Sequence, residues 1–115
     1  MTPAPDGEAV RARLLAERAA AQRQLAALRS DFAGIVAAST DSNADDEHDP
    51  EGATIAFERS QVAALARQAE TRLVETEAAL SRLAAGTYGV CERCSAPIPA
   101  ERLEARPTAR TCVHC

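Results

Sequence analysis

The sequence predicts a mainly α-helical fold, in which an antiparallel helical hairpin with an acidic tip is followed by a small cysteine-rich lobe. Three observations support this prediction. Apolar residues recur at heptad spacing in two segments of similar length, carboxylates gather between these segments, and all four cysteines fall within the last 25 residues. The 115-residue chain contains only three aromatic residues. A thick core with a large apolar pocket is therefore difficult to build, which argues against an enzyme for small molecules.

The first heptad pattern runs from Glu8 to about Ala38 and predicts an amphipathic helix of coiled-coil type. One set of its apolar positions comprises Leu14, Ala21, Leu28 and Ile35, and the other includes Leu25 and Phe32. Arg18 lies between Leu14 and Ala21 in the same stripe, so the pattern has one polar interruption.

The second heptad pattern predicts a helix from about Pro50 to Ala85. Its apolar sets are Ile55, Val62 and Ala69, and Ala66, Leu73 and Leu80. Asp49 is suited to capping the start of this helix, and Pro50 to the first helical position, where no internal hydrogen bond is lost. Gly86 is suited to end the helix.

An antiparallel arrangement requires facing residues to have a constant sum of residue numbers, here about 94. The predicted pairs are Leu14 with Leu80, Arg18 with Thr76, Ala21 with Leu73, Leu25 with Ala69, Leu28 with Ala66, and Phe32 with Val62. The polar interruption at Arg18 thereby meets a polar partner. Stripes of this kind also suit a dimerising coiled coil, but the intramolecular pairing favours a monomer.

The segment between the helices, at about residues 41–53, is predicted to form an acidic tip. It holds six carboxylates, and the simplest interpretation is a solvated connection with capping acids. The functional interpretation is that the hairpin presents these groups to a basic groove or to a metal ion held by a partner. The candidate contact residues are Asp45, Asp46, Asp49, Glu51 and Ala53.

Two CxxC pairs, Cys91 with Cys94 and Cys112 with Cys115, are separated by 17 residues. This spacing is typical of a four-cysteine site for one structural Zn²⁺, and four thiolates leave no open coordination position for catalysis. The alternatives are a redox-active pair or free buried cysteines. We expect two domains, the hairpin at 1–85 and a C-terminal four-cysteine zinc finger at 86–115, with His114 facing solvent.

Charge and hydropathy restrict the partners and the location. The net charge of −4 disfavours a protein devoted to phosphate backbones, so specific DNA binding is not expected. No apolar run is long enough to span a bilayer, and the first residues do not resemble a leader sequence. We therefore expect a cytoplasmic protein without membrane association, in which cysteines bind metal rather than form disulfides.

The run Gly86-Thr87-Tyr88-Gly89-Val90-Cys91-Glu92-Arg93-Cys94, with Ile98 and residues 102–109 before Cys112, closely resembles the zinc-finger signature of the bacterial DksA/TraR family. The chain looks like a short form without the C-terminal helix of larger members. The resemblance implies a transcription factor that binds RNA polymerase and inserts its coiled-coil tip into the secondary channel to modulate initiation.

The family's tip motif, Asp-x-x-Asp-x-Ala, aligns with His48, Glu51 and Ala53, so the match is partial; Asp49 would supply the first acid after a shift of one residue. The resemblance also implies the alarmone ppGpp as a partner. Of the residues that match one family site for it, Arg106 is kept, whereas Glu75 stands in place of a lysine. Binding of ppGpp is thus supported only in part. Arg102 and Arg106 are candidates for polymerase or ppGpp contact, or for salt bridges within the finger.

Three functions are consistent with the sequence. The first is a non-enzymatic regulator of RNA polymerase. The second is a zinc ribbon that binds nucleic acid through arginines of the finger, although Glu92, Glu101 and Glu104 are interspersed among them. The third is a transcript-cleavage-type factor whose tip carboxylates hold a magnesium ion, which requires two of them to converge. The resemblance favours the first.

Overall fold

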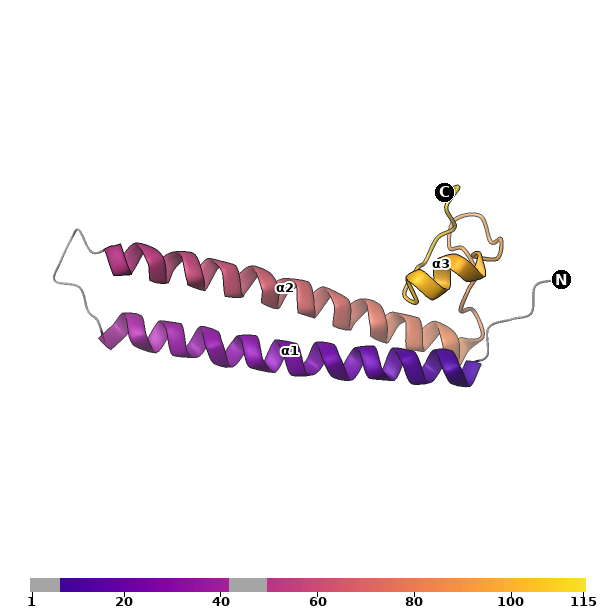
Figure 1. The fold of residues 1–115 in the computed structure, drawn as a ribbon. Helices are drawn as coiled ribbons and strands as arrows, with labels where there is room; N and C mark the ends of the chain where they lie inside the picture. The colour runs from indigo at the N-terminus through magenta and orange to yellow at the C-terminus, as the bar shows by residue number, and fades with distance from the viewer. Residues whose placement is uncertain (1–6, 42–49) are drawn as a thin grey trace. The chain divides into compact units, whose positions relative to one another are not determined.

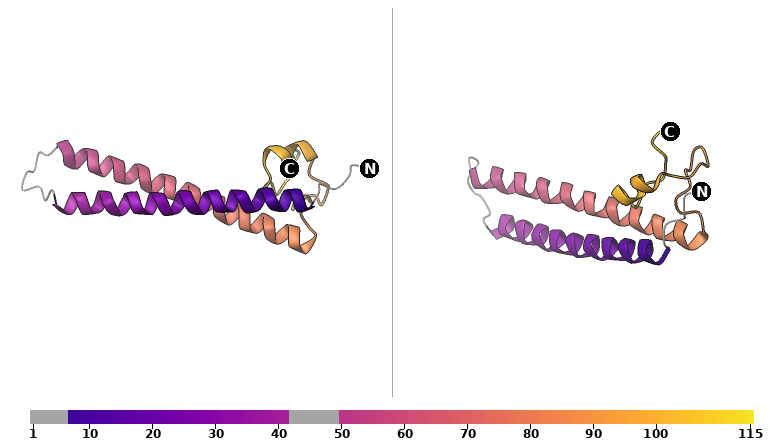
Figure 2. Two further views of the ribbon diagram at one scale, coloured as in Figure 1. Left: turned by 60° about the horizontal axis from the view of Figure 1, so that its bottom comes forward. Right: turned by 45° about the vertical axis from the view of Figure 1, so that its right-hand side comes forward.

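The computed structural model describes residues 7–41 and 50–115. In these ranges it has three helices, α1 (Gly7–Asp41), α2 (Pro50–Ala85) and α3 (Ala100–Ala105). The two long helices form a hairpin (Figures 1 and 2), which confirms the predicted fold class. Helix α2 has the predicted bounds, whereas α1 continues three residues beyond Ala38 and α3 was not predicted.

The described chain divides into two compact units. The first joins residues 7–19 to residues 72–115, and the second joins residues 20–41 to residues 50–71. The boundary at residues 85 and 86 that the sequence predicts lies inside the first unit, and it stays a prediction. None of the described helices is both long and apolar enough to cross a membrane.

In the first unit, the seam between the long helices is built from small and medium side chains. Leu14 and Ala79 are fully buried, and Thr76 is buried as well. The Thr76 hydroxyl donates to the carbonyl of Arg72 one turn earlier, at 2.7 Å, so this buried polar group is satisfied within α2 and needs no partner on α1. The ion pair beside it joins Arg72 to Glu17 at 3.1 Å.

In the second unit, Ala21 and Leu25 of α1 are buried at the four-residue step of a heptad pattern, and Ala69 of α2 is buried as well. An exposed ion pair joins Arg29 to Glu70 at 3.5 Å. The residue numbers of this pair add up to slightly more than the predicted sum, and those of the Glu17–Arg72 pair to slightly less. Both pairs therefore agree with antiparallel helices. Because these pairs are exposed, they contribute little stability, and the buried seam carries most of it.

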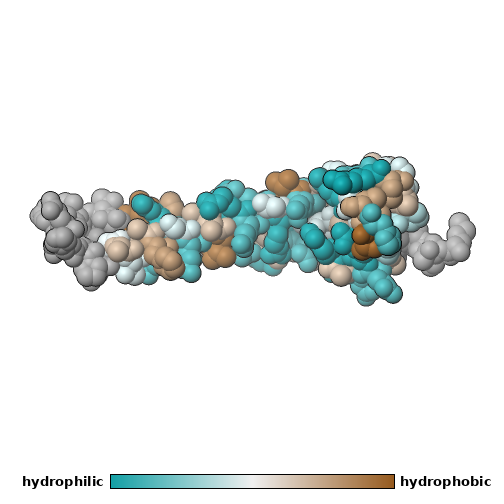
Figure 3. Space-filling model, turned by 90° about the horizontal axis from the view of Figure 1, so that it is seen from above, coloured by the Kyte–Doolittle hydropathy of each residue, from teal (hydrophilic) through white to brown (hydrophobic). Residues whose placement is uncertain are grey.

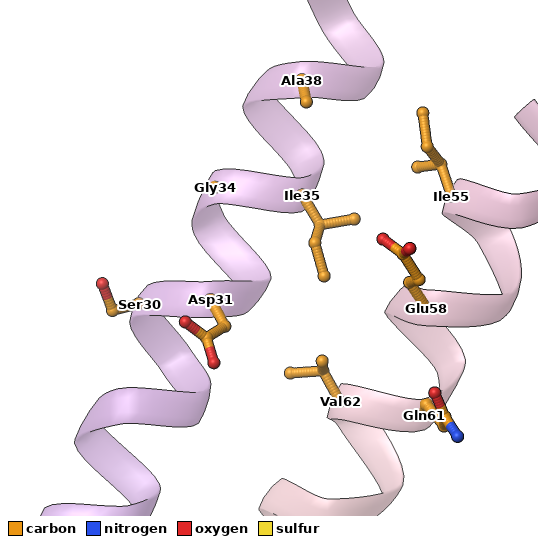
Figure 4. Close-up of a pocket in the computed structure, with 9 residues that line it drawn as sticks. All are labelled: Ser30, Asp31, Gly34, Ile35, Ala38, Ile55, Glu58, Gln61 and Val62. Carbon is orange, nitrogen blue, oxygen red and sulfur yellow. The ribbon is translucent and has the colours of Figure 1, made fainter. Parts of the chain in front are cut away.

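The seam becomes looser towards the end of α1 and the start of α2. Ile35 and Val62 are only half-buried, and Phe32 is 36% exposed. An open groove of about 520 Å³ lies between the helices here, with the Asp31 and Glu58 carboxylates beside the aliphatic side chains (Figure 4). On the face drawn in Figure 3, hydrophobic patches alternate with hydrophilic ones over the helices. The predicted pairing of Phe32 with Val62 therefore does not produce a sealed seam.

Helix α2 ends at a Schellman motif centred on Gly86, as predicted. The Thr87 amide donates to the Arg82 carbonyl at 2.9 Å, and the Gly86 amide donates to the Leu83 carbonyl at 3.3 Å. Gly86 has a φ of +80°, the left-handed region in which a side chain is unfavourable. This turn directs the chain from α2 into the cysteine-rich lobe.

We expect Leu14→Ala to lower the free energy of unfolding by about 2–5 kcal/mol, because it removes a fully buried side chain from the seam. Leu65→Ala is the matched control, since Leu65 is 41% exposed and should lose less than about 1 kcal/mol. Urea unfolding followed by circular dichroism at 222 nm measures both. Equal losses would contradict the assignment of Leu14 to the seam.

Two glycines should respond to alanine in opposite directions. Gly86→Ala should destabilise the protein by about 1 kcal/mol, because the added Cβ is strained at positive φ. Gly34→Ala should stabilise it by about 0.5–1 kcal/mol, since Gly34 lies inside α1 and a Cβ added there would meet open space. Thermal unfolding of the two variants tests the pair, and a shift of the same sign in both would contradict the prediction.

Candidate metal centre

The first cysteine pair lies on a tight β-like turn. Val90 and Pro97 form an isolated antiparallel bridge, and the Cys91 amide donates to the Ala96 carbonyl at 2.8 Å. Within the turn, the Ser95 amide donates to the Cys91 carbonyl at 3.0 Å, and Ser95 itself has a φ of +62°. This reversal directs the sulfurs of Cys91 and Cys94 towards the same point.

A short helix and a small apolar cluster connect the first pair to the second. Leu103 of α3 is buried with Ile98, Ala109 and the two inner cysteines, Cys91 and Cys112, and Tyr88 packs against this cluster. Gly89 has a φ of +82°, where a side chain is strained, although a Cβ there would only touch Leu103, at 3.5 Å. The lobe therefore has a core of its own, but a very small one.

The segment before the second cysteine pair, residues 107–111, has no regular secondary structure, and donors from other elements hold its carbonyl groups. The Tyr88 hydroxyl donates to Pro107 at 2.8 Å, and the Glu92 amide donates to Arg110 at 2.9 Å. Arg82 at the end of α2 and Arg102 of α3 donate to the Thr108 and Thr111 carbonyls at 3.4 and 2.8 Å. Partial burial raises the pKa of Tyr88 and lowers that of Arg82, which nearby Arg110 lowers further.

The four cysteine sulfurs converge as the sequence predicts. Their Sγ atoms all lie within 4.8 Å of one another, with 3.4 Å between Cys112 and Cys115 and 3.6 Å between Cys94 and Cys112. A tetrahedral zinc ion with Zn–S bonds of about 2.3 Å requires sulfur separations of about 3.8 Å. The donor set and its spacing therefore fit Zn²⁺, which would be held by all four thiolates and supply a cross-link between the two turns.

Cys91 and Cys112 are buried, whereas Cys94 and Cys115 are exposed. The amides of Cys112 and Cys94 point at Cys91 and lower its pKa to about 6. The His114 amide and the Cys115 thiol likewise lower the pKa of Cys112. Hydrogen bonds to Cys112 and then to Cys94 raise the pKa of Cys115 to about 12. The hydrogen bonds within the cluster thus lower the pKa of both buried cysteines and raise the pKa of Cys115.

The other predicted site residues are placed less fully. Asp45, Asp46 and Asp49 and the Glu51 side chain lie outside the described residues, and Ala53 is exposed near the start of α2. In the finger, Arg106 and His114 are exposed, whereas Arg102 is half-buried against the segment before Cys112. The sequence did not indicate the anchoring roles of Tyr88 and Arg82, because a side-chain bond to a backbone carbonyl leaves no pattern in the sequence.

Comparison with known proteins identifies the cysteine-rich lobe. Residues 86–115 match the family model described as the prokaryotic dksA/traR C4-type zinc finger. The match spans both CxxC pairs and begins at the glycine that ends α2. The predicted resemblance and the predicted zinc cofactor are therefore confirmed for this part of the chain.

Among curated proteins, the chain is similar to general stress protein 16O of Bacillus subtilis strain 168, with 39% identity over 73 residues, 64% of this chain and 45% of that protein. It is also similar to the RNA polymerase-binding transcription factor DksA of Haemophilus influenzae, with 42% identity over 50 residues, 43% of this chain and 34% of that protein. The chain spans 28–45% of the length of the curated relatives it matches.

Among solved structures, the chain resembles transcription factor DksA2 from Pseudomonas aeruginosa. The TM-score is 0.78 at 25% sequence identity, and the match covers 94% of this chain and 78% of that one. Because it extends well beyond the finger, this likeness includes the helical hairpin. The chain therefore has a DksA-like fold.

We expect zinc binding near neutral pH to release protons, because Cys115, with its pKa raised to about 12, must become a thiolate to bind the metal. The apparent zinc affinity should rise about tenfold per pH unit for each proton released. Below about pH 6 the dependence should steepen, since Cys91 is then protonated too. Titration with zinc in weak buffer containing phenol red measures the proton release. Zinc uptake without proton release would contradict the prediction.

Proposed function

Because residues 86–115 are a zinc finger of the dksA/traR C4 type, we propose that this chain is a transcription regulator that binds RNA polymerase. In this proposal, the hairpin tip enters the secondary channel of the enzyme and modulates initiation. The observation that carries the proposal is the combination of this finger with a DksA-like hairpin in one chain, since the structural likeness covers 94% of it. The polymerase-binding DksA of Haemophilus influenzae supplies the precedent for the partner.

The parts of the molecule suit this role. Four thiolates close the coordination shell of zinc, so the metal has a structural role rather than a catalytic one. Zinc stabilises a lobe whose apolar core is too small to be stable alone, and this lobe adjoins the base of the hairpin in the first compact unit. The segment of sequence between α1 and α2 carries the acids Asp45, Asp46 and Asp49, which are complementary to a basic channel.

Nucleic-acid binding by the finger is less well supported. Arg110 is paired with Glu92 at 3.7 Å, and Arg102 donates to the Thr111 carbonyl. Two of the four arginines that could contact a nucleic acid are thus engaged within the finger; the four are Arg93, Arg102, Arg106 and Arg110. The net charge of −4 also opposes approach to a phosphate backbone. For these reasons we propose a protein partner rather than a nucleic acid, in a cytoplasmic setting.

The test separates binding from the action of the tip. We expect the zinc-bound chain to bind RNA polymerase and to change the yield of promoter-initiated transcripts. Asp45→Lys with Asp46→Lys should reduce the change in yield at least about tenfold, because reversing two charges removes the attraction to a basic channel. Transcription from a purified promoter template measures the yield, and fluorescence anisotropy of the labelled chain measures polymerase binding.

The control is Glu77→Lys with Glu101→Lys, which makes the same change in net charge at two exposed positions outside residues 41–53. It should keep the wild-type effect on initiation. Equal loss in both double variants would show that net charge, not the tip, is responsible. Failure of the wild-type chain to bind polymerase at micromolar concentration would contradict the proposal as a whole.

A further inference from the structure

We propose that Arg102 is a positioning residue of the zinc centre, which fixes the backbone directly before Cys112 and so holds the second cysteine pair in place for the metal. The sequence offers Arg102 for contact with a partner or for a salt bridge within the finger. Its side chain instead points into the finger, where Nε donates to the Thr111 carbonyl at 2.8 Å. This inference goes beyond the proposed function and does not depend on polymerase.

Helix α3 is firmly attached to the first cysteine pair. The Ile98 amide donates to the Gly89 carbonyl at 2.7 Å, and Val90 bridges Pro97 just before the helix begins. On the other side, Leu103 is buried beside Cys91 and Cys112. Arg102 is the neighbour of Leu103, and its position is therefore set by the part of the finger that carries the first pair.

The second cysteine pair is held by a few contacts close to Cys112. They include the main-chain bond from Glu92 to the Arg110 carbonyl, the Arg110–Glu92 ion pair at 3.7 Å, the Cys112 amide that points at Cys91, and the side-chain bond from Arg102 to the Thr111 carbonyl. Two of these hydrogen bonds hold the successive carbonyl groups of Arg110 and Thr111. The first bond comes from the turn that carries the first cysteine pair, and the second comes from α3. Arg102 thus connects the element that fixes Cys91 to the residue that precedes Cys112.

The charge of Arg102 acts in the same direction as its hydrogen bond. A zinc ion with four thiolates has a net charge of −2, and a cation near it offsets part of this charge. The guanidinium is held at the residue next to Cys112 and is half-buried, so solvent screens it less than it screens an exposed arginine. Loss of Arg102 should therefore both loosen the second pair and leave the bound zinc less well stabilised.

Arg106 provides a matched control. It lies one helical turn further along the chain and has the same charge, but its side chain is exposed, and its backbone rather than its side chain contacts Arg102. Arg102→Met and Arg106→Met each remove one positive charge and keep an unbranched side chain. A difference between them therefore reports the position of Arg102 at Thr111 and not the net charge of the finger.

The experiment measures the rate of zinc transfer from the full chain to excess 4-(2-pyridylazo)resorcinol. We expect Arg102→Met to release zinc at least about tenfold faster than wild type, as is usual for outer partners of a metal site, and Arg106→Met to stay within about twofold. Arg102→Lys keeps the charge and one donor and should lie between wild type and Arg102→Met. Equal rates for the two methionine variants would overturn the proposal.

A second readout separates positioning from general unfolding. With Co²⁺ in place of zinc, Arg102→Met should keep the visible absorption of a tetrahedral four-thiolate site but need about tenfold more Co²⁺ to reach it, while the helical signal at 222 nm is unchanged. If Arg102→Met binds neither zinc nor Co²⁺, the rates of zinc release from Arg102→Lys and Arg106→Lys are compared instead. Faster release from Arg102→Lys supports the proposal, and equal rates overturn it.

Discussion

Convergence of four thiolates on one metal ion is the constraint on which the lobe depends. Sulfurs from two turns, 17 residues apart in the sequence, must lie within 4.8 Å of one another. The apolar cluster contains the two inner cysteines themselves, so the metal site and the core are the same structure. Because zinc binding and folding are then one process, the finger needs neither a thick core nor disulfides.

The finger is also continuous with the base of the hairpin. Gly86 ends α2 with a turn that delivers the chain to the first cysteine pair, and Arg82, one turn earlier in the helix, donates to the Thr108 carbonyl. Tyr88 bonds to the neighbouring carbonyl of Pro107. The same few residues therefore stop the helix and hold the segment leading to Cys112, which explains why the finger and the helix ends form one compact unit.

The sequence predicted those features that repeat or that obey fixed spacing. The heptads located both long helices, Asp49-Pro50 and Gly86 located the bounds of α2, and the CxxC spacing located the metal ligands. It could not predict α3, because six residues are too few for a periodic pattern and their helix depends on packing Leu103 into the core. Side-chain bonds to carbonyls, such as that of Arg102, have no sequence signature at all.

The two parts of the chain differ in how strongly their structure restricts their sequence. A coiled-coil seam needs only apolar side chains of suitable size, and here Ala21, Ala69 and Ala79 serve alongside Leu14 and Leu25. The finger requires cysteines at fixed positions, glycines at positive φ and donors for particular carbonyls. This difference explains why the family model matches residues 86–115, whereas the likeness to DksA2 covers 94% of the chain at 25% identity.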